Sequence, residues 1–553
     1  MKKIFLSRSS GNMTPEVGRI LASLTPGEPA EILFEKGVYH FFKEGAAVSE
    51  RLVNAVRPGR KSYAFLLDGL SDIVIDGNGS EFVFHERMFP VGMFHCRNIV
   101  LRNFTVDFTF SRYAQGRVTA SDEHGFALEI DPALFPVEVD AQGCLNFLAG
   151  GERFSTAPGC DKVLLVNGIF GKKPWDYLFV GPHSPEDCAD LPVKYFETDA
   201  VKTPDGVRFT FRPGSFTRCF EPGETLIFSY EPRDNADIMA QSCRDVTLEH
   251  VALYRGGGMG VVVSDTENFT AADTVIQVRP GRGECRSTTA DGFYFTQCRG
   301  LVALRNCLIS QTLDDALNLH GIYTLVSEIV APDTVKLFLA GTDNHHGFAP
   351  CRPGDMLEFS SADTHCRKTS RRVLECVEED ALHYRVKLDR AASVAELDVV
   401  ENETAAADFE LVDCRIDRCP HCRISDNGKI RVSGNVFEKI HGIRILDLFS
   451  FWYESGAVTD LILDNNQFTD SPCPGADPSP VIAVRSRRKP GNDVPHRNVT
   501  IRNNTFTNCG SGDPLMILAD TDGLTVTGNR SDGGRMAKIT NCTQVATDFP
   551  LES

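Results

Sequence analysis

The sequence is poor in features that mark several common classes of protein. It has no run of about 18 apolar residues, so a membrane-spanning helix is excluded. Its 18 cysteines are spread thinly over 553 residues, far below the density of a disulfide-stapled scaffold. Tryptophan occurs only twice. These absences leave a folded, non-membrane protein in which each tryptophan is a candidate for a special role.

Positive charge is also in deficit. Lys and Arg total 57 against 75 Asp and Glu, a net charge of −18. Nucleic acids and anionic lipid surfaces both select for excess Lys and Arg, so we expect neither as a partner. Hydrophobic residues at 42% and charged residues at 24% exclude wholesale disorder.

The N-terminus and the cysteines bear on the compartment. Met1–Arg8 has two lysines but only three apolar residues before Ser and Arg, whereas a secretory signal needs about 7–15. We expect a cytoplasmic protein with buried free thiols; a secreted or periplasmic protein is the alternative if the natural chain starts earlier. Cys419–Cys422 has CxxC spacing, but no second pair follows, so metal or redox function there is the weaker interpretation.

A short motif recurs along the chain: a polar residue, an apolar-x-apolar alternation, then Asn or Asp. Such alternation indicates short strands with one buried face, and the closing Asn or Asp favours a turn. Several spacings match one coil of a solenoid: 269 − 246 = 23, 430 − 409 = 21 and 524 − 499 = 25. Clear copies are Asp72–Asp76, Asn98–Asn103, Asp460–Asn466, Asn498–Asn504 and Gly523–Asn529.

The pattern predicts an all-β fold, a right-handed parallel β-helix, with an amphipathic stretch near Thr14–Leu24 covering its first coil. Two intervals, from Ile99 to Val246 and from Val302 to Phe409, are far longer than one coil. We expect a small antiparallel β-barrel inserted in each. The predicted domains are an N-terminal cap with first coils (1–110), an inserted barrel (111–235), coils with the candidate site (236–322), a second barrel (323–405) and C-terminal coils (406–553).

Three aspartates form the candidate catalytic set. Asp291 precedes Asp314 by 23 residues, one coil, and Asp315 follows directly. Stacked carboxyls split their pKa values, so one can stay protonated beside ionised neighbours. A proton donor beside a carboxylate base is what glycosidic bond hydrolysis needs. A structural capping role for a single Asp and calcium binding by the cluster are the alternatives.

These segments resemble glycoside hydrolase family 110, the bacterial α-1,3-galactosidases, some of which act on the blood group B antigen, and more distantly the β-helix hydrolases of polygalacturonan. That family also inserts β-barrels into its β-helix. The resemblance is found in Ser287–Phe293, Asn306–Ser310, Asp314–Gly321 and Trp452–Gly456.

The resemblance implies an inverting hydrolysis of terminal α-1,3-linked galactose that needs no metal and no cofactor. Asp314 would be the general acid, and Asp291 and Asp315 would together hold and deprotonate water. An inverting pair is typically about 6.5–9.5 Å apart, which leaves room for that water.

Four further residues are candidates for substrate binding. The Trp452 indole could stack on the C–H face of galactose, or it could be a core residue, and Glu454 could accept hydrogen bonds from sugar hydroxyls. Asn318 and His320 could line the pocket or buttress the aspartates. The expected partner is a glycan with a terminal α-galactose; an inserted barrel could also support a homodimer.

Other functions stay open at this point. A galacturonide hydrolase would need a basic subsite, a polysaccharide lyase would need calcium and a Lys or Arg base, and a glycan-binding solenoid would need no catalysis. The basic run Arg485–Lys489 is most often a solvated loop, with contact to an acidic glycan as the alternative.

Overall fold

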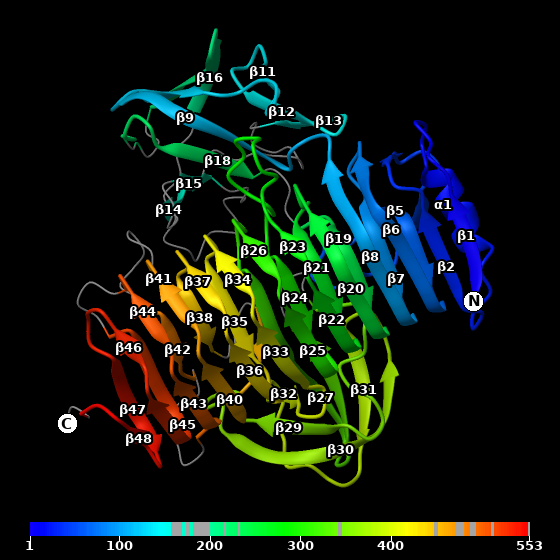
Figure 1. Cartoon of the computed structure of the whole chain (residues 1–553). Coiled ribbons are helices and arrows are strands. Elements are labelled where there is room, and N and C mark those ends of the chain that lie inside the picture. Colours follow the sequence, from blue (N-terminus) through cyan, green and yellow to red (C-terminus); the bar gives the residue numbers. More distant parts are fainter. Residues whose placement is uncertain are drawn as a thin grey trace.

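The computed structural model describes residues 1–155, 169–172, 177–180, 198–213, 217, 219–229, 233–340, 345–446, 452–471, 480–486, 494–509 and 514–550. Apart from one helix, the regular elements of the described chain are strands, and they wind into a right-handed parallel β-helix (Figure 1). Each coil contributes strands to three parallel sheets around an apolar core. The predicted fold class is confirmed.

The first sheet contains the strands of the recurring motif. Its members pair in parallel in the order β2 (Ala30–Phe34), β6 (Ser71–Phe84), β8 (Arg97–Phe108), β20 (Arg244–Leu253), β22 (Glu267–Ala272), β25 (Arg299–Arg305), β33 (Ala407–Val412), β36 (Lys429–Ser433), β40 (Asp460–Asp464), β43 (His496–Arg502) and β45 (Met516–Thr527). The predicted one-coil spacings are the observed registers, because Val246 faces Phe269, Phe409 faces Ile430 and Val499 faces Leu524.

The second sheet is the narrowest. After β3 (Val38–Phe41) and the second halves of β6, β8 and β20, it continues through β23 (Val275–Ile276), β26 (Leu308–Ser310), β34 (Arg415–Asp417), β37 (Val436–Glu438), β41 (Gln467–Thr469), β44 (Thr505–Thr507) and β46 (Arg530–Ser531). A ladder of amides runs beside it: Asn435 donates to Asn466, Asn466 to Asn504 and Asn504 to Asn529, each at 2.9 Å from one coil to the next. The motif asparagines therefore hold coils together.

The third sheet leads to the candidate site. Its order is β5 (Lys61–Asp68), β7 (Phe89–Phe94), β19 (Ala236–Gln241), β21 (Met259–Ser264), β24 (Phe293–Thr296), β27 (Leu317–Ala331), β35 (His421–Ser425), β38 (Gly442–Ile445), β42 (Ile482–Val484), β45 and β47 (Ala537–Thr543). Short strands β4 (Ala47–Ser49) and β48 (Ala546–Thr547) pair with β5 and β45, and β39 (Glu454–Ser455) runs antiparallel to β27.

The N-terminal end of the β-helix is covered as expected. Helix α1 (Thr14–Ala22) buries Thr14, Val17, Ile20 and Leu21 and lies over the first coils (Figure 1). Strand β1 (Lys2–Leu6), which the sequence did not predict, pairs in parallel with β2. Among the described residues no helix is long and apolar enough to cross a membrane.

The first insertion lies between β8 and β19, at the top of Figure 1. A seven-stranded sheet has the order β14 (Ile169–Lys172), β15 (Tyr177–Val180), β18 (Thr225–Ser229), β9 (Tyr113–Asp122), β10 (Gly125–Glu129), β17 (Gly206–Phe211), β16 (Thr198–Thr203), beside a three-stranded sheet of β11 (Val137–Val139), β12 (Leu145–Ala149) and β13 (Glu152–Ser155). The described order ends at β14 and β16, so closure into a barrel stays a prediction, as do the bounds 111–235.

The second insertion is a closed ring of antiparallel pairs. The order is β27, β28 (Thr334–Leu339), β31 (His383–Leu388), β30 (Arg367–Glu378), β29 (Met356–Ser360), β32 (Val399–Asn402) and back to β27. Strand β27 crosses the predicted boundary after residue 322: it pairs with β24 and β35 in the third sheet and then continues into the barrel. The barrel is therefore joined to the candidate site by one continuous strand.

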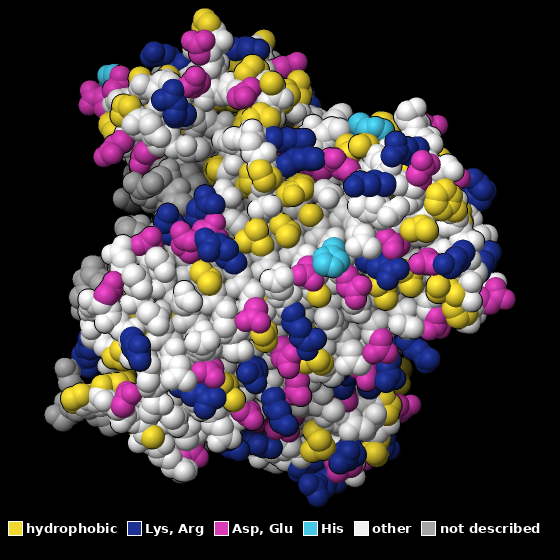
Figure 2. All heavy atoms as spheres, in the orientation of Figure 1, with side chains coloured by type: hydrophobic (Ala, Val, Ile, Leu, Met, Phe, Trp, Pro, Cys, Tyr) yellow, Lys and Arg dark blue, Asp and Glu magenta, His cyan; other side chains and the backbone are white. Residues whose placement is uncertain are grey.

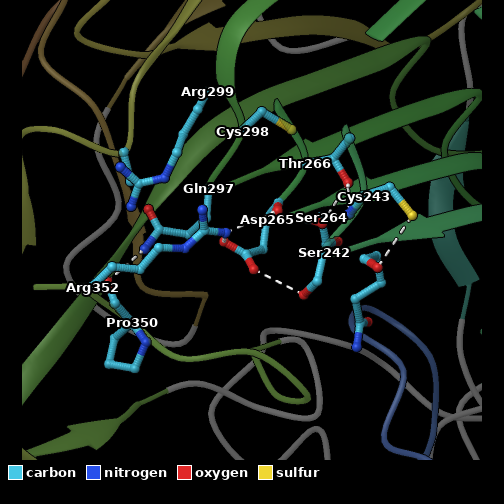
Figure 3. Close-up of polar contacts among 12 residues, drawn as sticks. Ser242, Cys243, Ser264, Asp265, Thr266, Gln297, Cys298, Arg299, Pro350 and Arg352 are labelled. Carbon is cyan, nitrogen blue, oxygen red and sulfur yellow. Dashed lines mark hydrogen bonds and ion pairs between the residues drawn. The ribbon is translucent and has the colours of Figure 1, made fainter. Parts of the chain in front are cut away.

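A loop of the second insertion is anchored beside the third sheet by polar contacts (Figure 3). Asp265 lies between Ser242, whose hydroxyl donates to it at 2.8 Å, and Arg352, whose guanidinium is 2.5 Å away. The Gln297 amide donates to the Pro350 carbonyl at 3.1 Å. These contacts fix residues 345–355, which lead toward the candidate site.

The acidic surplus is not gathered in one place on the visible face. Figure 2 shows acidic and basic side chains interspersed over the coils. Many form ion pairs between neighbouring coils, such as Arg102 with Asp76 and Arg502 with Asp464. Most of these pairs are exposed, so each contributes little to stability.

Candidate active site

The three aspartates come together at the start of two neighbouring third-sheet strands. Asp291 lies two residues before β24, and Asp314 and Asp315 lie just before β27. One carboxylate oxygen from each lies within 4.8 Å of the others. The register is 24 residues, because Phe293 faces Leu317, so within the Asp314–Asp315 pair it is Asp315 that lies at the register position of Asp291. Asp314 comes one residue before the register partner of Asp291.

Threonines fix both turns that carry the aspartates. The Thr288 hydroxyl donates to the Ala290 carbonyl at 2.7 Å, and the Thr312 hydroxyl donates to the Asp314 carbonyl at the same distance. The two threonines are themselves 24 residues apart, and the Leu313 amide donates to the Thr288 carbonyl. The repeated Thr-x-x-Asp spacing thus builds the same turn on two coils.

Asp315 is buried, and two side chains from the next coil hold its carboxylate: the Arg423 guanidinium and the His421 imidazole. Its Oδ2 lies 2.9 Å from Arg423 Nε, and its Oδ1 lies 3.3 Å from His421 Nδ1. Both partners are on β35. Burial lowers the pKa of His421, an effect that the nearby Asp315 carboxylate only partly offsets. Asp315 is therefore fixed in position beside a guanidinium.

Asp314 is the accessible member of the set. Its side chain is 49% exposed, and its Oδ2 lies 3.2 Å from an Arg233 guanidinium nitrogen. Burial alone would lower the pKa of Arg233, but the carboxylates of Asp291 and Asp314 raise it above its ordinary value. Arg233 therefore supplies a permanent positive charge between two of the three aspartates.

Asp291 holds its proton most firmly. Burial is the largest effect and raises its pKa well above the ordinary value, the Asp314 carboxylate raises it further, and Arg233 opposes both. A buried carboxyl with a like charge beside it keeps a proton that an exposed one releases. Asp291 therefore favours its protonated form more strongly than an exposed aspartate does.

Glu454 joins the cluster from β39. The Asn318 amide donates to its Oε1 at 3.1 Å, and His320 Nε2 lies 3.7 Å from the same atom. Arg423 lies 3.9 Å from the other carboxylate oxygen, so one guanidinium links Glu454 to Asp315. Asn318 faces Arg423 in the strand register.

His320 has a buttressing geometry. It is 1% exposed, and its Nδ1 donates to the Gly321 carbonyl at 2.6 Å. Burial lowers its pKa, with Glu454 acting in the opposite direction. Asn318 is different: its amide nitrogen donates to Glu454, while its Oδ1 is buried without a hydrogen-bond partner among the described residues. Asn318 therefore has hydrogen-bonding capacity that the described contacts do not use.

Trp452 lies at the site, but its ring is already in contact with a cation. The Arg233 guanidinium sits 5.1 Å from the ring centroid, and His345 Nε2 donates to the Trp452 carbonyl at 2.7 Å. Arg233 therefore lies over one face of the indole. His345 comes from the loop that the Asp265–Arg352 contact anchors.

The nearest carboxylate oxygens of the three aspartates lie within 4.8 Å of one another, closer than the separation of about 6.5–9.5 Å that is typical of an inverting acid–base pair. In the CxxC segment both thiols are fully buried, and His421 between them contacts Asp315, in line with the expectation of buried free thiols there.

Three residues of the site were not predicted from the sequence: Arg233, His421 and Arg423. His421 and Arg423 follow the second insertion, more than 100 residues after the aspartates, and only the one-coil register of β27 with β35 brings them close. Arg233 ends the first insertion and has no motif around it.

A hard cation could use the three carboxylates as ligands, but the donor set fits poorly. Calcium takes about 6–8 oxygen ligands. Asp315 already engages both oxygens with Arg423 and His421, and Arg233 lies against Asp314. In the described cluster, the charges of Arg233 and Arg423 already balance the carboxylates. They occupy the surroundings in which a cation would have to bind.

Comparison with known proteins gives a consistent picture. No family model matches the chain. An α-1,3-galactosidase B of Bacteroides thetaiotaomicron is 28% identical over 539 residues, 94% of this chain and 83% of its own. An α-1,3-galactosidase A of Shewanella woodyi is 27% identical over 535 residues, with the same shares covered. The resemblance to the α-1,3-galactosidases is confirmed.

Solved structures with similar folds were also found. A polygalacturonase from Erwinia carotovora ssp. carotovora aligns over 98% of this chain and 95% of its own, with a TM-score of 0.37 and 12% identity. A family 28 exopolygalacturonase from Yersinia enterocolitica aligns over 100% and 79%, with a TM-score of 0.37 and 10% identity.

Proposed function

We propose that the protein is a glycoside hydrolase that removes terminal α-1,3-linked galactose from glycans. The observation that carries the proposal is the aspartate cluster, in which a buried carboxyl of raised pKa lies beside two carboxylates. General acid and general base from neighbouring carboxyls are what glycoside hydrolysis requires. The curated relatives named α-1,3-galactosidase, matched over most of this chain, support the choice of linkage.

Asp314 is the proposed general acid. It is the half-exposed member and so the one that a leaving oxygen can reach. In the free protein the shared proton resides on Asp291. A bound sugar excludes water from Asp314, which disfavours its charged form, and the proton passes across the cluster to it.

Asp291, now ionised, and Asp315 then hold the attacking water and accept its proton. Oxygens up to 4.8 Å apart can both hydrogen-bond one water, since such bonds are about 2.7–2.8 Å long. Arg423 and His421 keep Asp315 in place during this step.

We propose inversion of configuration, although the close spacing is nearer to the roughly 5–5.5 Å of retaining enzymes. A retaining enzyme needs an ionised carboxylate free to bond the anomeric carbon. Asp315 has both oxygens engaged by Arg423 and His421, and Asp291 shares the attacking water with it. Water activated by both is then the better nucleophile.

The sugar-binding roles are assigned to residues around the cluster. Asn318 and Glu454 accept hydrogen bonds from galactose hydroxyls, and Trp452 packs on the sugar. His320 supports Glu454. Fucosylated blood group B chains and linear Galα1-3Gal both present the required terminal galactose.

A linkage panel tests this function. We expect purified protein to release galactose from Galα1-3Gal, and at least about 100-fold more slowly from α1-4 and α1-6 linked digalactosides, since misplacing the leaving oxygen by about 1 Å costs that much. Galactose release is measured by anion-exchange chromatography. Turnover of polygalacturonate with none of Galα1-3Gal would instead establish the galacturonide hydrolase.

A further inference from the structure

A row of arginines extends from the aspartate cluster toward the C-terminal coils. Arg423 is on β35, Arg444 faces it on β38, and Arg485 directly follows β42 on the next coil. We call these three residues the arginine row. Neighbouring coils of parallel strands lie about 4.8 Å apart, so the row begins beside Asp315 and continues away from it.

The members differ in what balances their charge. Arg423 is paired with Asp315 and Glu454. Arg444 is only 7% exposed, yet it donates to two backbone carbonyls, Ile443 at 3.1 Å and His441 at 2.8 Å. Within the part of the chain that the structure describes, no carboxylate is at ion-pair distance from Arg444 or from the exposed Arg485.

The energetics of this arrangement favour an anion. Burial, followed by the cations of Arg485 and Arg423, lowers the pKa of Arg444 to about 10. A buried charge without a counter-ion is costly, and guanidinium groups bind the oxygens of carboxylates, sulfates and phosphates through paired N–H donors. An anion beside Arg444 and Arg485 would relieve this cost, in a protein whose net charge is otherwise −18.

We infer that Arg444 and Arg485, adjoining Arg423, form a subsite for an oxyanion on the sugar next to the scissile bond, a sulfate ester or a uronate carboxylate. This rests on the proposed function, in which terminal galactose occupies the aspartate cluster and the rest of the glycan lies outside it. The substrate is then an α-1,3-galactoside whose sugar next to the scissile bond carries an anionic group. Of the basic run Arg485–Lys489, only Arg485 is assigned to the subsite, because residues 487–489 lie outside the described residues.

Three disaccharides test the subsite: Galα1-3Gal, the same sugar with a 6-O-sulfate on the reducing galactose, and Galα1-3 galacturonate. We expect kcat/KM for at least one anionic substrate to exceed that of the neutral one about tenfold or more, as for one charge-assisted pair. The anionic disaccharide with the higher kcat/KM shows whether the subsite binds a sulfate or a carboxylate. Arg485→Gln and Arg444→Lys should reduce this ratio toward 1.

Arg497, an exposed arginine on β43 in the first sheet, provides the matched control: Arg497→Gln should leave the ratio unchanged. Equal kcat/KM for all three substrates in the wild type, or an anionic preference that survives both variants, would overturn the subsite. Arg485 is exposed, so loss of folding does not confound its variant.

Direct binding separates this inference from the proposed function. If no disaccharide is cleaved, the function is wrong, and calorimetric titration with the same uncleaved sugars still tests the subsite. Tighter binding of an anionic sugar by the wild type than by Arg485→Gln supports it. Equal affinity for neutral and anionic sugars rejects it.

Discussion

Asp314→Asn is expected to lower kcat on Galα1-3Gal by about 10³-fold, because general acid catalysis contributes about 10²–10⁴-fold. The loss should depend on the leaving group. A dinitrophenyl α-galactoside departs without a proton, so its kcat should fall by about tenfold or less. The ratio of the two losses, from initial rates under saturating substrate, identifies the proton donor.

The fold should survive this change, since the Asp314 side chain is half exposed and its only described side-chain ion pair is with Arg233. Asp460→Asn, on β40 of the first sheet, is the control and should retain full activity. Equal losses on both substrates would mean that Asp314 is not the acid and that another carboxyl protonates the leaving oxygen.

Asp291→Asn should abolish most activity and yet stabilise the protein. Losing one of the two groups that hold the water should reduce kcat by about 10²–10⁴-fold. The Asp291 pKa is raised on folding, mainly by burial and then by Asp314. The asparagine amide carries no charge that burial disfavours. Replacing the Asp291 carboxyl by this amide should therefore raise the melting temperature at neutral pH.

The pH dependence follows from the same pKa. A carboxyl whose pKa is higher in the folded than in the unfolded state stabilises the fold fully below its unfolded pKa, and this is lost as pH rises toward the folded value. The melting-temperature difference between Asp291→Asn and wild type should therefore grow above about pH 4. A constant difference from pH 4 to pH 8, measured by calorimetry, would contradict a protonated Asp291.

Much of the fold follows from local sequence physics. Alternating apolar residues closed by Asn or Asp define a coil, and the spacings 23, 21 and 25 turn out to be strand registers. The jumps from Ile99 to Val246 and from Val302 to Phe409 likewise join neighbouring coils across the insertions. Because each coil contacts only its neighbours, the repeat largely determines the architecture.

The same logic brings Asp291, Asp314 and Asp315 together but does not supply their partners. The coil is 24 residues long in the turn as well as in the strand, so Asp315 is the register partner of Asp291 and Asp314 precedes it. Arg423 reaches Asp315 across a complete inserted barrel, and Arg233 reaches Trp452 from the other insertion. The first contact depends on which strand pairs with β27 after the insertion, and the second on how the first insertion lies against the coils; no local pattern encodes either.

Trp452 illustrates the limit most clearly. Its rarity marked it as a candidate for sugar stacking, and it does lie at the site. Its environment depends on Arg233 and on His345 in a loop held by Asp265 and Arg352. No property of the Trp-Tyr-Glu-Ser-Gly segment predicts that a guanidinium occupies one face of the indole.

One measurement tests the central claim most directly: proton NMR of Galα1-3Gal in the first minutes after the protein is added, before mutarotation mixes the anomers. We predict that β-galactose appears first, as water held by Asp291 and Asp315 attacks opposite the bond that Asp314 protonates. Release of α-galactose first would contradict this mechanism and make one of the two buried aspartates a covalent nucleophile. A spectrum without free galactose would reject the proposed function itself.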